Sequence, residues 1–536
     1  MSDPFTAADL ERLAAVGITE GEAQRQLALL RDPPAPVRLV RPATVGDGVL
    51  TLPDRQRLPL EIRWADVSSE GRTVKFVPAS GAASRMFRDL EEVLHGDADT
   101  DRESLTARAE EGDATAMRTL QLLDNLTRLA FYEDLDAALA EAGKDLQTLA
   151  AEGDLATLLE YLLTDADGDG LGYSAAPKGL VPFHRYPGDE RRTAFEEHMI
   201  EAVGTVRDEE GVCRLHLTVA PAHQPAFMER LEEVQERYQE RYECQFEVRF
   251  SPQLPATDTI AVDLEGNPFR TDDGKLLLRP GGHGALLPNL ASLDAELAVI
   301  KNVDNVVPER RQEPVLHWQR LLIGTLAELR QRTFDLLSRL ESTGGDDDDL
   351  LVDTAEHAAL LGHPMPQEIA EADAGRRRSW SIVRLNRPLR VCGVVANEGE
   401  PGGGPFWVDD GDGGESLQIV ERSQIDADDP EQEAILASAT HFNPVQLVCA
   451  LTDRDGDRYD LATYVDNKAV FIAERSHQGR PLKALERPGL WNGAMAGWNT
   501  VFVEVPLATF APVKTVFDLL RKAHQTGVPA AAKAAD

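Results

Sequence analysis

A turn of small residues beside an arginine is the first segment of the chain that could bind phosphate. Residues 72–78 form a strand-like apolar run, and Ala79-Ser80-Gly81-Ala82-Ala83-Ser84-Arg85 follows directly. Small residues allow backbone N–H groups to approach phosphate oxygens, and a guanidinium adds a positive charge. Ser80, Gly81, Ala82 and Arg85 are therefore candidate phosphate ligands, although a turn of this composition is about as often plain packing.

Two lysines stand in turns of a similar kind. Lys178 lies in Ala176-Pro177-Lys178-Gly179-Leu180-Val181-Pro182-Phe183, and Lys514 follows Phe510-Ala511-Pro512-Val513. A lysine in a turn is usually solvated surface, but an ammonium group is also a common ligand of phosphate. Lysine is scarce in this chain, which makes the placement of these two more telling.

A glycine-rich turn and an aspartate at a strand end form a third candidate. Arg279-Pro280-Gly281-Gly282-His283-Gly284 is difficult to explain as a hairpin alone, because three glycines cost chain entropy without filling a core. Asp304 follows the apolar run 298–303. The carboxyl ends of parallel strands are where α/β sheets bind ligands, and a carboxylate there can hold Mg²⁺. The alternative is a capping aspartate before a loop.

Taken in order, these segments resemble motifs of the sugar-1-phosphate nucleotidyltransferases, and of the UDP-sugar pyrophosphorylases in particular. Pro78 to Arg85 and Pro177 to Phe183 resemble L-x-x-G-x-G-T-R and P-K-x-L-x-P-V, with Ala83 where the family has its second glycine. The glycine turn resembles P-P-G-H-G-D-I-Y, and Val303-Asp304-Asn305 resembles C-V-D-N. The longest match is V-x-V-P-x-x-x-F-x-P-V-K-T-x-x-D-L-L, at residues 503–520. The chain also resembles a bacterial family catalogued as a domain of unknown function.

The resemblance implies roles for individual residues. Arg85, Lys178 and Lys514 would be catalytic phosphate ligands, and Asp304 would hold Mg²⁺. Residues that resemble the family's nucleotide ligands are Ser80, Gly81, Ala82, Gln253, Gly281, Gly282, His283 and Gly284. Residues that resemble the sugar ligands, in a glycine turn, an L-L-E-x-x-Q-V motif and an F-N-x-N motif, are Gly403, Gly404, Glu421 and Asn443. Paired polar groups suit recognition of sugar hydroxyls, because an unmatched hydroxyl leaves them unpaired.

The activity implied is transfer of a nucleotide from a nucleoside triphosphate, UTP in the first instance, to a sugar 1-phosphate, with release of pyrophosphate. Two alternatives stay open. One is a nucleotidyltransferase with a non-sugar phosphorylated acceptor, and the other is a non-catalytic protein that binds nucleotide sugars. Asp165-x-Asp167-x-Asp169-Gly170 matches the start of a calcium loop, but its twelfth position is Ala176 rather than Glu, so we expect a plain loop.

Alternating strand and helix patterns predict an α/β fold, and the resemblance implies a GT-A-like, Rossmann-like, three-layer arrangement with a mostly parallel central sheet. We expect strands in 37–64, helices in 225–242, 290–297, 314–341 and 513–524, and a polar acidic linker at 344–349. The expected domains are a helical prefix with short strands (1–72), a nucleotide-binding half (73–308) with a helical insertion (87–172), a helical connector (309–378), a sugar-phosphate-binding half (379–525) and a loose tail (526–536).

Composition limits the classes of partner. The chain has 536 residues and a net charge of −37, and a surface so acidic repels nucleic acid and anionic membranes. No apolar run is long enough to span a membrane, and the first residues lack a secretory pattern, so we expect a cytoplasmic protein. Four widely spaced cysteines predict free thiols. We expect a monomer or a small homo-oligomer.

Overall fold

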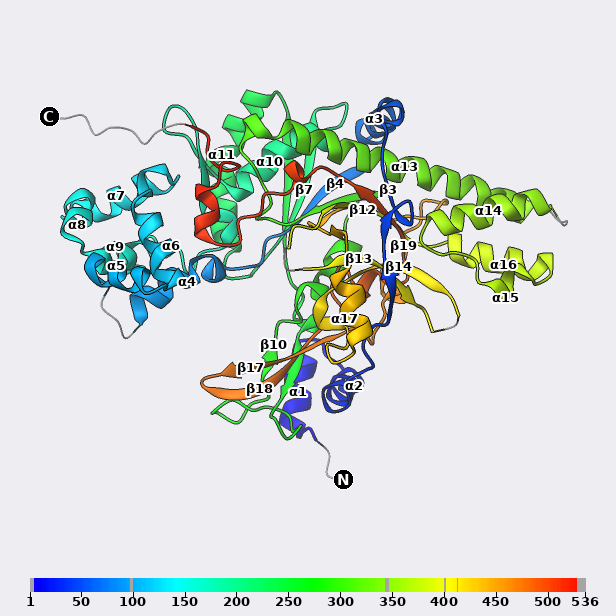
Figure 1. Ribbon diagram of the computed structural model, residues 1–536, viewed down its shortest axis with the longest axis horizontal. Helices are drawn as coiled ribbons and strands as arrows, with labels where there is room; N and C mark the ends of the chain where they lie inside the picture. The colour runs from blue at the N-terminus through cyan, green and yellow to red at the C-terminus, as the bar shows by residue number, and fades with distance from the viewer. Residues whose placement is uncertain (1–3, 97–99, 343–346, 400–401, 412, 528–536) are drawn as a thin grey trace. The chain divides into compact units, whose positions relative to one another are not determined.

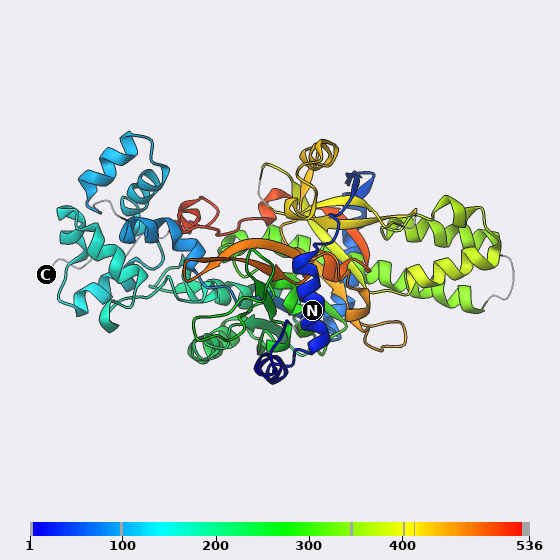
Figure 2. The same cartoon turned by 90° about the horizontal axis from the view of Figure 1, so that it is seen from below.

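The computed structural model describes residues 4–96, 100–342, 347–399, 402–411 and 413–527 (Figure 1, Figure 2). The chain divides into two compact units, each built from separate stretches. Unit 1 comprises residues 1–76, 253–301 and 318–507, and unit 2 comprises residues 77–252, 302–317 and 508–536. The fold is mixed α/β. In the described part of the chain, no helix is both long and apolar enough to cross a membrane.

Unit 1 is built on a mixed sheet. Its strands, in spatial order, are β2 (Thr44–Val45), β3 (Gly48–Leu50), β19 (Asn499–Glu504), β12 (Leu389–Ala396), β16 (Gln446–Ala450), β11 (Leu297–Lys301) and the start of β4 (Thr73–Pro78). Strand β16 runs antiparallel to both of its neighbours, and the other neighbouring pairs are parallel.

Both faces of this sheet are covered, which explains why its strands are apolar along their whole length. On one face Phe76, Ile300 and Phe502 pack with helix α12 (Leu287–Ala291). On the other face, helix α13 (Glu313–Ser342) lies against β12, and a Cβ on Gly393 would come within 3.2 Å of Leu322. Packed side chains therefore occupy both faces of this layer.

Smaller elements complete unit 1. An antiparallel sheet of β10 (Leu278–Arg279), β9 (Thr259–Val262), β18 (Arg480–Glu486) and β17 (Phe471–His477) packs against helices α1 (Ala7–Ala15) and α2 (Glu20–Arg31). A three-stranded sheet contains β1 (Leu39–Pro42), β13 (Gly404–Asp409) and β14 (Glu415–Val420). The remaining helices are α3 (Asp54–Ser69), α14 (Asp348–Leu360), α15 (Gln367–Ala370), α16 (Ala374–Leu385) and α17 (Pro430–Ala437), and both views show α14 and α16 beside α13.

Unit 2 contains a block of short helices and a βαβ unit. The block comprises α4 (Ser84–His95), α5 (Arg102–Glu110), α6 (Ala114–Leu123), α7 (Tyr132–Glu141), α8 (Leu146–Glu152) and α9 (Leu155–Leu163). Aspartates cap four of these helices through side-chain bonds to backbone N–H groups. Parallel strands β7 (Val212–Val219) and β8 (Gln245–Pro252) are joined by α11 (Gln224–Tyr242), while α10 (Ala194–Thr205) follows the hairpin of β5 (Pro182–Arg185) and β6 (Arg191–Thr193).

The strongly periodic segments are helical as predicted, and three segments differ from the prediction. Residues 54–69 form helix α3 rather than strands. The apolar side chains Leu58 and Ile62 of this helix are exposed, so the sequence lacks the apolar periodicity of a helix that buries one face. The predicted helix in 290–297 ends at Ala291, before strand β11. The predicted helix in 513–524 is a short 3₁₀ turn over Val516–Leu520.

Two other predictions fall partly on undescribed residues. Of the acidic linker 344–349, residues 344–346 lie outside the described chain, and Asp347 caps helix α14. The tail from residue 528 also lies outside the described residues. The four cysteines are free and buried, as predicted.

Helix α13 requires a glycine where α3 crosses it. A Cβ on Gly324 would lie 2.0 Å from the Leu60 carbonyl oxygen, whereas a Cβ on Gly21 in α2 would meet no atom within 4 Å. We expect Gly324→Ala to lower the free energy of unfolding by about 1–3 kcal/mol through overpacking. The matched change Gly21→Ala should raise it by roughly 0.5–1 kcal/mol. Urea unfolding of both variants measures the contrast, and equal effects would contradict it.

Candidate active site

The two halves of the candidate phosphate motif lie side by side in unit 2. Ala82 and Pro177 form a β-bridge, the Lys178 N–H donates to the Gly81 carbonyl at 3.2 Å, and the Ala83 N–H donates to Ala176 at 2.8 Å. The chain that forms helices α4–α9 therefore begins and ends at neighbouring points. Residues 81–83 and 176–178, almost a hundred residues apart in the sequence, lie side by side.

Asp304 joins the predicted lysines. Its Oδ2 accepts hydrogen bonds from Lys178 Nζ at 2.8 Å and from Lys514 Nζ at 3.2 Å. The Asp304 and Lys178 side chains are only 10% and 14% exposed, whereas Lys514 is 60% exposed. Three residues taken from three separate motifs thus meet at a single carboxylate oxygen, and we call them the Lys-Asp-Lys cluster.

Backbone contacts fix the position of Asp304. Its carbonyl accepts from the Val513 N–H at 3.0 Å, and the Asn305 side chain accepts from the Ala511 N–H at 3.0 Å. On the other side, His198 Nε2 of α10 lies 3.2 Å from the carbonyl oxygens of both Asn302 and Val303. The loop that carries Asp304 is held between α10 and the segment that carries Lys514.

The two lysines are positioned by different means. The Asp518 carboxylate accepts from the backbone N–H groups of Lys514 and Thr515 at 2.8 and 2.7 Å, and so holds the turn before the 3₁₀ segment. Next to Lys178, a Cβ on Gly179 would lie 2.9 Å from Phe227. Glycine is therefore required there for the Lys178 turn to pack closely.

Burial and charge act in opposite directions on this cluster. Burial would raise the pKa of Asp304, but the Lys178 and Lys514 ammonium groups outweigh it and hold that pKa below its usual value. Burial lowers the pKa of Lys178, and Asp304 restores part of the loss. With all three groups ionised the cluster has one surplus positive charge, and Lys514 presents it to solvent.

The turn at residues 80–85 is open. Gly81, Ala82 and Arg85 are exposed and Ser80 is partly buried, and no atom lies within 4 Å of the position of a Cβ on Gly81. Within the described chain, Arg85 makes no hydrogen bond or ion pair. Ala83, by contrast, is fully buried at the start of α4. The family's second glycine is thus replaced at a position where this chain packs a methyl group.

The glycine-rich turn of unit 1 packs closely on its own unit. A Cβ on Gly284 would lie 2.0 Å from the Pro488 carbonyl oxygen, and one on Gly281 would lie 2.4 Å from that of Thr257. Gly282 has a φ of +73°. Two of the three glycines are therefore explained by contact with neighbouring backbone, and the third by its left-handed conformation.

His283 is held in a defined orientation. Its Nδ1 accepts from the Leu490 N–H at 3.0 Å, and its ring stacks on Trp491 with centroids 4.1 Å apart. Burial lowers the pKa of His283 to about 4, so the ring is neutral at pH 7. The stack places Trp491 against one face of this uncharged ring.

The candidate sugar ligands also gather in unit 1. A Cβ on Gly403 would lie 3.3 Å from Glu421 Cγ, and the Asn443 N–H donates to the Gly403 carbonyl at 2.9 Å. Gly404 begins β13. Burial and the neighbouring Glu486 raise the pKa of Glu421, while a hydrogen bond with Trp491 opposes them. Trp491 thus touches both His283 and Glu421.

Asn443 and Gln253 differ in their surroundings. The Asn443 carbonyl oxygen accepts from the Val445 N–H at 2.7 Å, while its buried Nδ2 has no hydrogen-bond partner in the described chain. A buried amide donor of this kind is available to a ligand oxygen. Gln253 Nε2 lies 3.5 Å from Asp258, at the beginning of the loop that leads to β9.

Sequence reasoning missed four residues that shape these surfaces: Asp518, His198, Trp491 and Glu486. Asp518 had a sequence signal, since Thr515-x-x-Asp518 is a capping pattern. The other three act through contacts with residues far away in the chain. In the described residues no group of three or more His, Cys, Asp or Glu side chains could hold a metal ion.

A family model described as a domain of unknown function (DUF4301) matches residues 6–525. No curated protein matches the sequence. A UDP-glucose pyrophosphorylase variant from Leishmania major is similar over 97% of this chain and 82% of its own, with 12% identity and a TM-score of 0.43.

Two other solved structures are similar to the same degree. The uridine diphosphate N-acetylglucosamine pyrophosphorylase from Trypanosoma brucei has 12% identity and a TM-score of 0.44, over 97% of this chain and 82% of that one. A putative UDP-N-acetylglucosamine pyrophosphorylase from Entamoeba histolytica has 12% identity and a TM-score of 0.40, over 85% and 79%.

Removal of the Asp304 carboxylate should destabilise the fold, because Lys178 is buried beside it. We expect Asp304→Asn to lower the free energy of unfolding at pH 7 by about 3–5 kcal/mol, because a buried ammonium loses its partner. The pKa of Lys178 in the folded state is already lowered by burial, and without the Asp304 carboxylate it would fall further below the pKa of Lys178 in the unfolded state. The unfolded state then binds more protons, so stability recovers as pH rises toward 10.

Urea unfolding between pH 7 and 10 measures this recovery. The control is Lys178→Met in the Asp304→Asn background, which should remove most of the pH dependence. If Asp304→Asn stays less stable than the intact protein by the same free energy of unfolding across this pH range, the assignment of the buried charge to Lys178 is contradicted.

Proposed function

The chain belongs to the DUF4301 family of unknown function, and we propose that it is a nucleotidyltransferase that joins a nucleoside triphosphate to a sugar 1-phosphate and releases pyrophosphate. The observation that carries this proposal is the Lys-Asp-Lys cluster, where Lys178 and Lys514 share one Asp304 oxygen. These residues come from three motifs that resemble those of the UDP-sugar pyrophosphorylases. Their convergence on one point is what a shared phosphate-binding role requires.

The reaction needs positive charge held in place rather than a covalent enzyme intermediate. An oxygen of the sugar phosphate attacks the α-phosphorus, and the bond from that phosphorus to the pyrophosphate oxygen breaks. Charge shifts to the leaving pyrophosphate. Lys178 and Lys514 stabilise it, and Asp304 keeps both ammonium groups oriented beforehand. On the motif resemblance, the exposed Arg85 in the first turn of α4 would add a further positive charge.

Magnesium fits this site as a companion of the triphosphate. Asp304 offers a single carboxylate beside two ammonium groups, and Mg²⁺ is commonly held by one or two carboxylates together with substrate phosphates. Asp304 would be its protein ligand. When bound, the ion supplies further positive charge to the phosphate oxygens.

On the motif resemblance, a separate set of residues would recognise the uncharged parts of the substrates. His283 would contact the base, with Gln253 and the 281–284 turn as further nucleotide ligands. Glu421 and the unpartnered Asn443 amide suit sugar hydroxyls, beside Gly403 and Gly404. We assign UTP as the triphosphate on the motif resemblance.

A GT-A-like fold is part of the same proposal. It is supported by the parallel pairing of β3, β19 and β12, by the parallel pair β4 and β11, and by the position of Asp304 just beyond the carboxyl end of β11. The helical block α4–α9 would be an insertion in the phosphate loop of that fold.

Pyrophosphate release tests the proposal directly. The protein is incubated with Mg²⁺, each of four ribonucleoside triphosphates and a pool of sugar 1-phosphates. We expect release that needs both substrates and falls roughly 10²–10³-fold in Lys514→Met, since a preorganised charge is lost at the reacting phosphates. Lys522→Met, an exposed lysine of the same segment, is the control and should keep full activity. No release from any pair, with a nucleotide sugar still raising the melting temperature, would leave a binding protein instead.

Glu421 should govern affinity for the sugar. We expect Glu421→Gln to raise KM for the sugar 1-phosphate roughly tenfold or more while KM for the triphosphate changes little, because a charge-assisted hydrogen bond to a hydroxyl is lost. Initial rates with each substrate varied in turn measure this. Glu474→Gln, an exposed change on β17, is the control. Equal changes in both KM values would contradict the role.

A further inference from the structure

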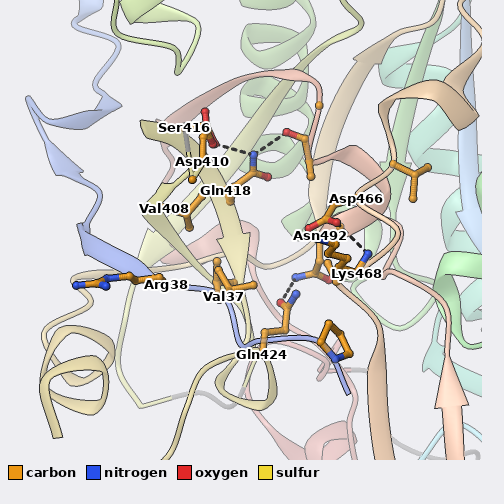
Figure 3. A pocket seen from close by; sticks show the side chains of 18 of the residues that line it. Val37, Arg38, Val408, Asp410, Ser416, Gln418, Gln424, Asp466, Lys468 and Asn492 are labelled. Atoms are coloured by element: carbon orange, nitrogen blue, oxygen red, sulfur yellow. Dashed lines mark hydrogen bonds between the residues drawn. The ribbon is translucent and has the colours of Figure 1, made fainter. Parts of the chain in front are cut away.

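Unit 1 contains a cavity of about 870 Å³ that uses none of the candidate nucleotide or sugar ligands. Figure 3 shows Val37, Gln418, Gln424 and Asn492 around it. These residues come from the chain before β1, from β14 and the turn after it, and from the loop after β18. The volume lies within the range of sites for small organic ligands.

Part of the cavity lining is cationic. Arg384 and Arg387 line the cavity together with His363, and burial and both guanidinium groups lower the pKa of His363 to about 3. The Arg387 Nη1 donates to the Gly497 carbonyl, another lining residue, at 3.2 Å. In a chain of net charge −37, two arginines in the lining of one cavity are a specific arrangement. A guanidinium pair of this kind suits carboxylate or phosphate groups.

The buried polar side chains of the lining are fixed in place. His363, 3% exposed, has a hydrogen bond with the Trp498 backbone. Asn492, 2% exposed, donates through Nδ2 to the Ile419 carbonyl at 2.9 Å, and its Oδ1 has no hydrogen-bond partner in the described chain. Polar side chains held in this way give the cavity a defined shape and polarity.

The carboxylates that line the cavity already accept local hydrogen bonds. Asp410 accepts from Ser416 Oγ at 2.6 Å, Asp466 from the Lys468 N–H at 2.9 Å, and Asp409 from the Gly411 N–H at 2.8 Å. In Figure 3, Asp410 lies beside Ser416 and Asp466 lies beside Lys468. Lys468 is exposed, and Arg38 extends away from the other labelled side chains.

Another part of the lining is apolar. Val37 packs in a cluster with Ile425, and Val470 and Ile472 also line the cavity. The amides of Gln424 and Asn492 line it as well and are bonded to each other at 3.3 Å. A ligand that matches this lining has a charged group, a hydrogen-bonding middle and an uncharged body.

We propose that this cavity is a second ligand site, which takes a small organic anion with its carboxylate or phosphate between Arg384 and Arg387 and its body toward Val37 and Ile425. The site is separate from the Lys-Asp-Lys cluster and does not depend on transferase activity. Its occupant would reach Gln424, whose side chain accepts from the Glu421 N–H at 3.0 Å.

Calorimetry with matched probes tests the site. Phenyl phosphate and benzoate each combine an anion with an apolar ring. Inorganic phosphate contains only the anion, and phenol contains only the ring. We expect one or both ring-bearing anions to bind the intact protein at least roughly tenfold more tightly than either half, since each end contributes contacts. The stronger of the two identifies the anion. Equal binding of inorganic phosphate or of phenol would overturn the proposal, as would no binding at millimolar concentration.

Variants locate the binding. Arg384→Gln and Arg387→Gln should each weaken it roughly tenfold, because one charge-assisted contact is lost. Arg378→Gln on the same helix α16 is the matched control and should bind as the intact protein does. Ser423→Trp, which fills the cavity from an exposed position on its rim, should abolish binding without removing a charge. Binding lost in Lys514→Met but kept in these variants would place the probe at the Lys-Asp-Lys cluster and overturn the second site.

Discussion

A single carboxylate oxygen, Asp304 Oδ2, holds unit 2 together where chemistry is expected. It receives Lys178 and Lys514, and the backbone on either side of it is bonded to α10 and to the segment before Lys514. Two ammonium groups this close would repel each other without the carboxylate. The surrounding capping, glycine packing and loop contacts all serve to keep these three groups in one place.

Sequence patterns were sufficient for much of the fold and for the members of the site. Helices with a clear apolar stripe, such as α11 and α13, were predicted to within a residue or two, because burial of one face dictates their spacing. Helix α3 was missed, because its apolar residues Leu58 and Ile62 are exposed and Pro59 lies inside it. The helix expected in 513–524 failed for a local reason: Asp518 caps a turn that ends after five residues.

The arrangement within the site could not be read from the sequence. Asp304 was predicted as a metal ligand, and the structure adds that its carboxylate is already bonded to two lysines. The glycines around His283 suggested contact with a ligand, whereas their neighbours are the Pro488 and Thr257 backbone. His198 and Trp491 act over large separations in the chain, and no local pattern marks a residue for such contacts.

The order of assembly follows from where the three charged residues lie in the chain. Lys178 and Asp304 are 126 residues apart, and Lys514 is a further 210 residues from Asp304. Closing loops of this length costs entropy before any contact rewards it, so such pairings form late in folding. During synthesis the ribosome must release residues 508–527 before Asp304 can meet its second lysine. A nascent chain therefore carries an incomplete charge cluster until Lys514 has left the ribosome, and a chain truncated before Lys514 never acquires it.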